Sequence, residues 1–257
     1  DNMDRGSLVH GVLERFWRKR HFADLRDMNA ETLMQTIHQA VQQTIEAFAA
    51  DSSQVSATVL TLEAERLCKL IADWLAFEKE RSVSFRIVDC EIEKKVQICG
   101  IEITLKIDRL HQLEDGGLEF VDYKTGQTPQ ISSWGDERIT EPQLPIYASF
   151  FSEADSDQIS GVYFGMVKTA EHDFSGVSVE NFEVEQGKRK PPLLNQFSDW
   201  ETLLAHWKTD IENIAREVRA GEAAVRFADE SDLAYCEVKP LLRLPERKLQ
   251  FERFQEK

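Results

Sequence analysis

Residues 102–126 read EITLKIDRLHQLEDGGLEFVDYKTG, and this stretch decides the fold. Polar and apolar residues alternate over Glu102–Ile107 and again over Leu118–Val121, as they do in half-buried strands. Asp115-Gly116-Gly117 lies between the two runs and has the composition of a tight turn. The stretch therefore predicts a β-hairpin.

Charged residues follow both predicted strands. Asp122 and Lys124 are two residues apart, so on a strand their side chains leave the same face. If Asp108 lies beside Asp122 across the hairpin, two carboxylates meet, and one must stay protonated unless a cation neutralises them. Asp-x-Lys alone is usually a surface ion pair, and Asp-Arg at a strand end is usually structural.

A divalent metal would resolve the conflict between the two carboxylates. Mg²⁺ binds about six oxygen ligands and often takes one or two carboxylates, with water and substrate phosphate completing its shell. Asp108, Asp122 and the backbone carbonyl of Tyr123 would supply part of such a shell. Lys124 could position or deprotonate a water beside it. This combination predicts metal-dependent hydrolysis of phosphodiesters.

Four motifs in order resemble the PD-(D/E)XK nuclease superfamily, in the branch of RecB- and AddB-type nuclease domains attached to DNA-repair helicases. The resemblance implies an α/β, restriction-endonuclease-like core, with a mixed central sheet flanked by helices and additional N- and C-terminal helices. The motifs are Gly6–His10, Lys106–Arg109, Asp122–Gly126 and Glu141–Ala148.

The resemblance also implies roles for single residues. His10, Asp108 and Asp122 would bind metal, and Lys124 would be catalytic. Gln143 and Tyr147, one helical turn apart, would shape the site and its DNA contact. An acidic residue before Asp108 often belongs to the pattern, and either Glu91 or Glu93 could fill that place.

His10 has two interpretations. It lies in a predicted amphipathic helix over Leu8–Arg20, where a histidine is by itself usually a packing or capping residue. The resemblance makes it a metal ligand instead. Imidazole suits Mn²⁺ at least as well as Mg²⁺, so the expected cofactor is Mg²⁺ or Mn²⁺.

The cysteines depart from the AddB-type pattern. Many of those domains hold an iron–sulfur cluster on four cysteines, three of them near the C-terminus. Here the matching region has only Cys236, with Leu233 and Leu242 at the places of its partners. A cluster needs about four ligands, so we expect no iron–sulfur cluster. Cys68, Cys90 and Cys99 are predicted to be reduced core thiols.

The net charge of −15 is unusual for a protein that binds DNA by itself, because phosphate contacts favour a basic face. One explanation is local positive charge, although solvated surface is the favoured interpretation of each basic cluster. The other is a helicase-like motor, in the same or a partner chain, that delivers the strand. The clusters are Arg15, Arg18, Lys19, Arg20 and His21; Lys188–Lys190; and Lys239, Arg243, Arg247 and Lys248.

The chain of 257 residues is long enough for one large domain, here predicted as a single nuclease domain over residues 1–257. A helical segment at about residues 22–80 would be inserted between the first helix and the core. The abrupt start predicts a C-terminal fragment of a larger protein. The absence of a signal-like start or a membrane-spanning run, with unpatterned cysteines, predicts a cytoplasmic protein.

These observations predict a metal-dependent DNA nuclease that acts on single-stranded or unwound DNA in recombination and repair. The alternative is a non-cleaving DNA-binding or scaffolding module of a helicase–nuclease complex. Periodicity places the remaining elements: helices at 29–48, 59–80, 143–151 and 200–220, and strands at 85–98, 162–167 and 177–184.

Overall fold

The structure is a computed structural model that describes residues 2–51, 55–151, 158–169, 171–182, 191–222, 224, 233 and 236–255. The chain forms two compact units, Asp1–Ala215 and Arg216–Lys257, and each is described by itself.

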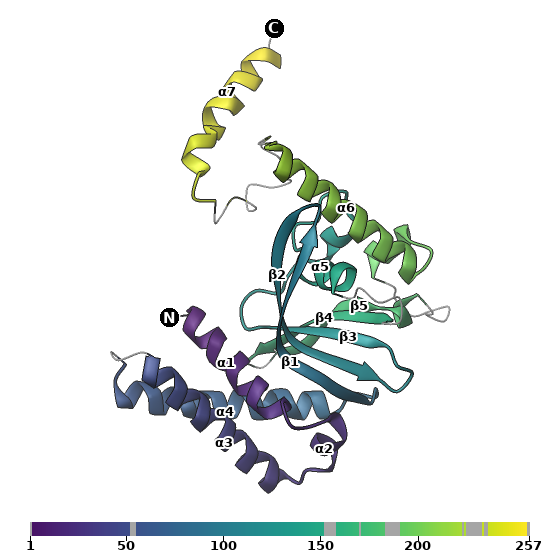
Figure 1. Cartoon of the computed structure of the whole chain (residues 1–257). Coiled ribbons are helices and arrows are strands. Elements are labelled where there is room, and N and C mark those ends of the chain that lie inside the picture. Colours follow the sequence, from purple (N-terminus) through teal and green to yellow (C-terminus); the bar gives the residue numbers. More distant parts are fainter. Residues whose placement is uncertain are drawn as a thin grey trace. The chain divides into compact units, whose positions relative to one another are not determined.

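A five-stranded mixed sheet forms the centre of the first unit (Figure 1). Neighbouring strands are antiparallel except β3 and β4, which are parallel. A parallel pair requires a crossover connection, and α5 (Gln143–Phe150) lies in it. The strands, in spatial as well as sequence order, are β1 (Phe85–Ile98), β2 (Ile101–Leu113), β3 (Leu118–Lys124), β4 (Ile159–Lys168) and β5 (Glu171–Ser178).

Two tight turns set the register of the first three strands. Cys99 and Gly100 join β1 to β2, and both have positive φ, 48° and 84°, as a two-residue hairpin turn of type I′ requires. Between β2 and β3, Gly116 has φ 94°. The Gly117 N–H there donates to Asp115 Oδ1 at 2.9 Å. The predicted hairpin is therefore confirmed, with longer strands than the alternation indicated.

Helices cover both faces of the sheet. One apolar cluster joins the sheet to α1 (Asn2–Trp17), α2 (Phe22–Asp27), α3 (Ala30–Asp51) and α4 (Ala57–Lys79). The other joins it to α5, to the 3₁₀ turns η1 (Ile131–Gly135) and η3 (Pro192–Gln196), and to α6 (Trp200–Ala220) as far as Ala215. Four tryptophans anchor the two clusters with fully buried side chains: Trp17, Trp74, Trp134 and Trp207.

The fold class is as predicted, an α/β core with a mixed sheet, flanking helices and helices at both ends of the chain. The segment α2–α4 does lie between α1 and the sheet in sequence, and the predicted helices occur within a few residues of their expected bounds. The single nuclease domain over the whole chain stays a prediction.

The prediction of a strand at residues 177–184 is wrong. Strand β5 begins earlier and ends at Ser178, and the 3₁₀ turn η2 (Val179–Asn181) follows. The Ser178 N–H donates to Asn181 Oδ1 at 2.8 Å, so a side-chain acceptor takes the donor that a longer strand would use. Residues 183 and 184 lie outside the described residues.

The second unit holds the 3₁₀ turn η5 (Lys239–Leu242) and α7 (Leu244–Gln255). Its large apolar side chains Leu241, Leu249, Phe251 and Phe254 are exposed. Across the described parts of both units, no helix combines the length and the apolar character needed to cross a membrane.

Candidate functional site

The two aspartates predicted to bind metal lie side by side at one end of the β2–β3 pair. Arg109 pairs with Val121, which makes Asp108 and Asp122 the next positions of the antiparallel ladder. Both carboxylates are buried, with exposed fractions of 8% and 2%. The Tyr123 N–H donates to Asp108 Oδ2 at 2.6 Å, so the backbone of β3 fixes this carboxylate.

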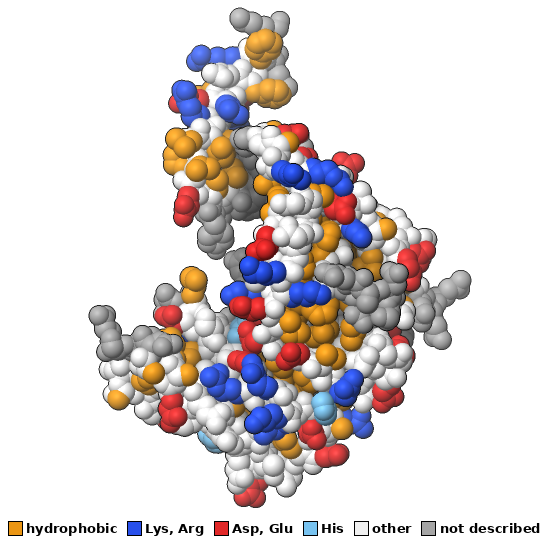
Figure 2. Space-filling view, viewed as in Figure 1, with side chains coloured by type: hydrophobic (Ala, Val, Ile, Leu, Met, Phe, Trp, Pro, Cys, Tyr) orange, Lys and Arg blue, Asp and Glu red, His pale blue; other side chains and the backbone are white. Residues whose placement is uncertain are grey.

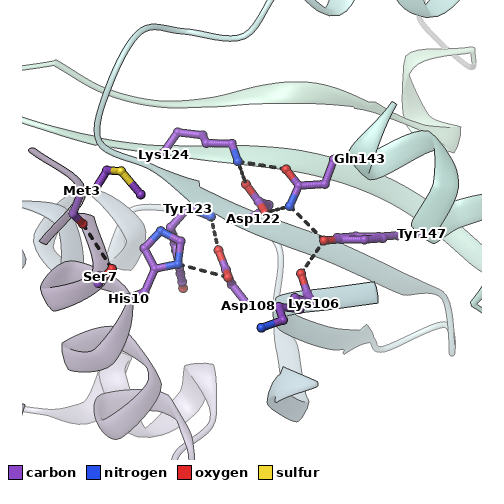
Figure 3. Close-up of polar contacts among 10 residues, drawn as sticks. All are labelled: Met3, Ser7, His10, Lys106, Asp108, Asp122, Tyr123, Lys124, Gln143 and Tyr147. Carbon is purple, nitrogen blue, oxygen red and sulfur yellow. Dashed lines mark hydrogen bonds and ion pairs between the residues drawn. The ribbon is translucent and has the colours of Figure 1, made fainter. Parts of the chain in front are cut away.

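Helix α1 brings His10 to the same place. Val9 and Leu13 bury one face of the helix against the sheet, and this packing sets the position of the histidine. His10 Nδ1 lies 3.1 Å from Asp108 Oδ1 (Figure 3). The two residues are 98 positions apart in sequence, so only the folded chain brings them together.

Glu91 completes this group. One ligand atom each from His10, Glu91 and Asp108 lie within 4.8 Å of one another. Glu91 has φ 52°, an uncommon conformation for a residue other than glycine. Glu93 instead pairs with Lys106, its carboxylate 3.2 Å from the ammonium and its side chain 66% exposed. The geometry therefore favours Glu91 over Glu93 as the supporting acid.

Lys124, Asp122 and Gln143 form a second, connected group (Figure 3). Lys124 Nζ lies 2.6 Å from Asp122 Oδ2 and donates to Gln143 Oε1 at 2.9 Å. Gln143 Nε2 donates to Asp122 Oδ1 and, at 2.8 Å, to the Tyr147 hydroxyl. That hydroxyl donates in turn to the carbonyl of Lys106 on β2. Helix α5 thus orients the lysine through an amide and a phenol.

Tyr123 contacts the site through its backbone and through the edge of its ring, which lies 6.1 Å from the His10 ring, centre to centre. Tyr123 is 2% exposed, and its side chain packs in the apolar cluster that joins the sheet to α1–α4. The Arg109 guanidinium lies 5.6 Å from the centre of its ring. Its backbone N–H is engaged by Asp108. The role of its carbonyl as a metal ligand stays a prediction.

Negative charge dominates the site. Burial and the charge of Asp108 raise the pKa of Asp122 to about 6, although Lys124 opposes this change. Burial and Asp108 also raise the pKa of Glu91 to about 7. Burial alone would lower the pKa of His10, but its hydrogen bond to Asp108 and the nearby carboxylates raise it above the ordinary value. The carboxylates of Asp108, Asp122 and Glu91 thus repel one another, and Lys124 offsets part of this repulsion at Asp122.

The donor set fits a hard or borderline divalent cation. Carboxylate oxygens and one imidazole nitrogen are ligands that Mg²⁺ and Mn²⁺ accept, and a cation would remove the repulsion between the carboxylates. Within the described ranges, His10, Glu91 and Asp108 are the one group of three or more potential ligands this close together.

The cysteines contribute nothing to this group. Cys90 is buried, as predicted, and burial raises the pKa of its thiol to about 12, so it stays protonated. Cys68, Cys99 and Cys236 are partly exposed, and Cys68 and Cys99 pack at the edges of the two apolar clusters.

The basic clusters in the sequence lie at separate places on the protein. On the face in Figure 2, Lys and Arg side chains alternate with Asp and Glu instead of forming one continuous basic surface. Arg15, Arg18, Lys19 and Arg20 line one small cavity between α1 and α3, whereas Lys239, Arg243, Arg247 and Lys248 line another within the second unit. Residues 188–190 lie outside the described residues.

The family of this chain follows from a comparison with models of protein families. A search of curated proteins found no match. Seven chains of known structure match, among them one described as the crystal structure of SSO0001. It has 12% identity and a TM-score of 0.36, with 76% of this chain and 77% of that chain covered. The sequence profile of the PD-(D/E)XK nuclease superfamily matches residues 1–241. The chain therefore belongs to the PD-(D/E)XK nuclease superfamily.

Proposed function

We propose that this protein is a divalent-metal-dependent deoxyribonuclease that hydrolyses phosphodiester bonds of single-stranded or unwound DNA in recombination and repair. The observation that carries the proposal is the group of His10, Glu91 and Asp108, with Asp122 next to Asp108 across the hairpin and bonded to Lys124, which Gln143 also orients. An arrangement of excess carboxylates around one lysine is costly without a cation.

His10, Glu91, Asp108 and Asp122 would hold Mg²⁺ or Mn²⁺, and Tyr123 would add its carbonyl. When bound there, the cation would supply positive charge for the phosphoryl transition state and lower the pKa of a coordinated water. Preorganised charge of this kind is usually the largest single contribution to such catalysis.

Lys124 has a separate task. Its ammonium is directed by Asp122 and Gln143, so it can donate to a phosphate oxygen or hold the attacking water in line. Gln143 positions the lysine, and Tyr147 positions Gln143 through its own bond to the β2 backbone. We assign Gln143 and Tyr147 to shaping the site and contacting the strand.

The superfamily implies a nucleic-acid substrate. We further propose DNA as that substrate, a cytoplasmic location, and a helicase-like motor in the same or a partner chain. The net charge of −15 supports the motor, because a delivered strand requires little affinity from the nuclease itself.

Cleavage of end-labelled single-stranded DNA with Mn²⁺ or Mg²⁺ tests the proposal. Asp122→Ala and Lys124→Ala should each abolish metal-dependent cutting. Asp136→Ala and Lys95→Ala remove exposed residues of the same types and should leave it intact. Absence of cutting by the unaltered chain on single-stranded, duplex and forked DNA, with metal bound, would instead indicate the non-cleaving module.

The metal preference tests His10 separately. Because imidazole is a softer ligand than carboxylate, Mn²⁺ should support cutting as well as Mg²⁺ or better. A titration in which Mg²⁺ is strongly preferred would count against His10 as a ligand, whatever happens to the other residues.

A further inference from the structure

We propose that a basic cavity next to the site binds the sugar–phosphate backbone of a single-stranded nucleic acid. The inference rests on the proposed function for the identity of its ligand and adds the surface along which the strand runs. The cavity measures about 440 Å³ and is lined by Arg5 and Val9 of α1, Arg66 and Leu70 of α4, Thr125, Gly126, and Val167–Thr169 at the end of β4.

The cavity adjoins the candidate catalytic residues through the chain itself. Thr125 and Gly126 directly follow Lys124, and Val9 directly precedes His10. A Cβ atom at Gly6 would lie 3.5 Å from Thr125 Oγ1, so the first turns of α1 run close past the end of β3. A strand whose phosphate occupies the site therefore has this cavity within reach of a neighbouring phosphate.

Positive charge exceeds negative charge around the cavity. Arg66 holds Glu63 with two contacts from its Nε, 2.9 and 3.0 Å, and Arg5 Nε lies 3.6 Å from the same carboxylate. One carboxylate thus serves two guanidinium groups. Lys168 adds a third cation, and its Nζ donates to the neutral hydroxyl of Thr128 at 3.0 Å.

These cations are also accessible. The Arg5 side chain is 60% exposed and that of Arg66 33% exposed, in contrast to the fully buried Arg109. Planar guanidinium groups match the oxygens of a phosphate, and release of counterions favours such contacts. A phosphate backbone is the ligand chemistry that this set recognises.

A neighbouring cavity with a partly apolar lining, which also contains Asp4, Arg5 and Glu63, favours a single strand over a duplex. It measures about 320 Å³ and shares Arg5 with the basic cavity. Unstacked bases offer faces that pack on such surfaces, whereas the bases of a duplex are already stacked. Its apolar lining consists of Leu8, Phe48, Val55, Val59 and Leu60.

The salt dependence of binding gives the sharpest test. Fluorescence anisotropy would measure the affinity of the chain for a labelled oligothymidine in EDTA, which prevents cutting, over a series of KCl concentrations. Each cation removed should reduce the slope of log affinity against log salt by about 0.7. The triple variant Arg5→Gln/Arg66→Gln/Lys168→Gln should therefore lose about 2 from the slope.

Two matched variants control this experiment. Arg18→Gln removes another arginine, which lies just after α1, pairs with Glu14 and lines a different basic cavity, and it should leave the slope unchanged. Glu63→Gln removes the competing carboxylate and should strengthen binding a few-fold. Circular dichroism and thermal unfolding would establish that each variant folds. An unchanged slope in a folded triple variant, or an equal loss in Arg18→Gln, would overturn the inference.

Cleavage kinetics separate this inference from the proposed function. With Mn²⁺ present, the triple variant should raise KM about tenfold and retain kcat, because the cavity lies beside the reacting phosphate. If the unaltered chain binds as described but cuts no nucleic acid, the proposed function fails and the binding surface stands. If it cuts and the triple variant has an unchanged KM and slope, the binding surface alone fails.

Discussion

Asp108 and Arg109 are consecutive residues, but they lie in opposite electrostatic environments. Arg109 is fully buried and pairs with Glu78 at 2.6 Å, while Trp17 and Phe85 lie within 5.2 Å of its guanidinium. Asp108 belongs to a group with more carboxylates than cations, at a partly exposed edge.

The charges around Arg109 are balanced. Arg81 lies 3.7 Å from Glu119, which also accepts a 2.7 Å contact from the buried His111. Arg81 also lies 4.0 Å from Glu78, so the two carboxylates of Glu78 and Glu119 face the two guanidinium groups of Arg81 and Arg109. Balanced pairs offset the cost of burial and hold the strands, whereas the unbalanced group beside Asp108 retains capacity for a ligand. The comparison shows how one strand can serve stability at one residue and binding at the next.

The largest expected effect comes from breaking the balanced region. Glu78→Gln leaves Arg109 as an uncompensated buried charge and should cost about 3–5 kcal/mol of unfolding free energy. Urea denaturation would measure it, with the exposed Glu80→Gln as control. The double variant Glu78→Leu/Arg109→Met, which removes both charges, should recover most of the loss. A loss below about 1 kcal/mol in Glu78→Gln would show that the pair is not needed.

At the acid-rich group around Asp108, a substitution should affect activity and leave stability intact. Asp108→Asn removes a charge from an acid-rich site, so the unfolding free energy should stay the same or rise. Cutting should fall about 10²–10³-fold or more, because charge stabilisation of the transition state is lost. Parallel assays of stability and cleavage check both parts. A variant that unfolds and remains inactive for that reason would contradict the distinction between the two regions.

Glu91 and Glu93 provide a smaller and more specific comparison. Glu91→Gln alters the group with His10 and should reduce activity or Mn²⁺ affinity by about 10–100-fold. Glu93→Gln removes an exposed partner of Lys106 and should change either quantity less than about twofold. Isothermal titration with Mn²⁺ would measure affinity without cutting. Equal effects of the two substitutions would remove Glu91 from the site.

The smallest expected effect is the pH response of His111. Burial, opposed by its hydrogen bond to Glu119 and reinforced by Arg109 and Arg81, lowers the pKa of His111 to about 4. The unfolded chain therefore takes up a proton on this histidine below pH ~6.5, whereas the folded chain does not, and the contribution of His111 to stability falls as the pH drops toward 4.

Between pH 7.5 and 5 this proton uptake should cost about 1–2 kcal/mol of unfolding free energy. Because Glu91 and Asp122 titrate in the same range with the opposite effect on stability, urea denaturation of the unaltered chain and of His111→Gln at both pH values would isolate this contribution as the difference between the two proteins. His111→Gln has no such proton to take up, so it should lose correspondingly less than the unaltered chain. The same pH dependence in both proteins would show that His111 does not control it.

Much of the site could be predicted because it depends on local signals. Alternation and the Asp115-Gly116-Gly117 turn predict the hairpin that brings Asp108 beside Asp122. The sequence also contains a signal that favours Glu91 over Glu93 as the acidic residue beside Asp108. A two-residue turn at Cys99-Gly100 pairs Glu93 with Lys106 and places Glu91 across from Asp108.

Other features had no local signal. The pairing of Arg109 with Glu78 joins a strand to a helix through the fold, and neither residue has a sequence neighbour that indicates it. The end of β5 depends on one side-chain hydrogen bond from Ser178 to Asn181, which competes with an alternating pattern that continues to Val179. Basic residues that are far apart in sequence, such as Arg5 and Lys168, meet in one cavity only after folding.

The position of His10 on α1 links the first helix to whatever binds at Asp108. Most of the affinity of α1 for the sheet comes from buried residues such as Val9, Val12 and Phe16, and His10 adds a contact that a ligand can strengthen. By mass action, a ligand held by both residues favours the docked helix over a frayed one. Slower hydrogen exchange of the α1 amides should therefore report that a ligand occupies the site, even where no substrate is cut.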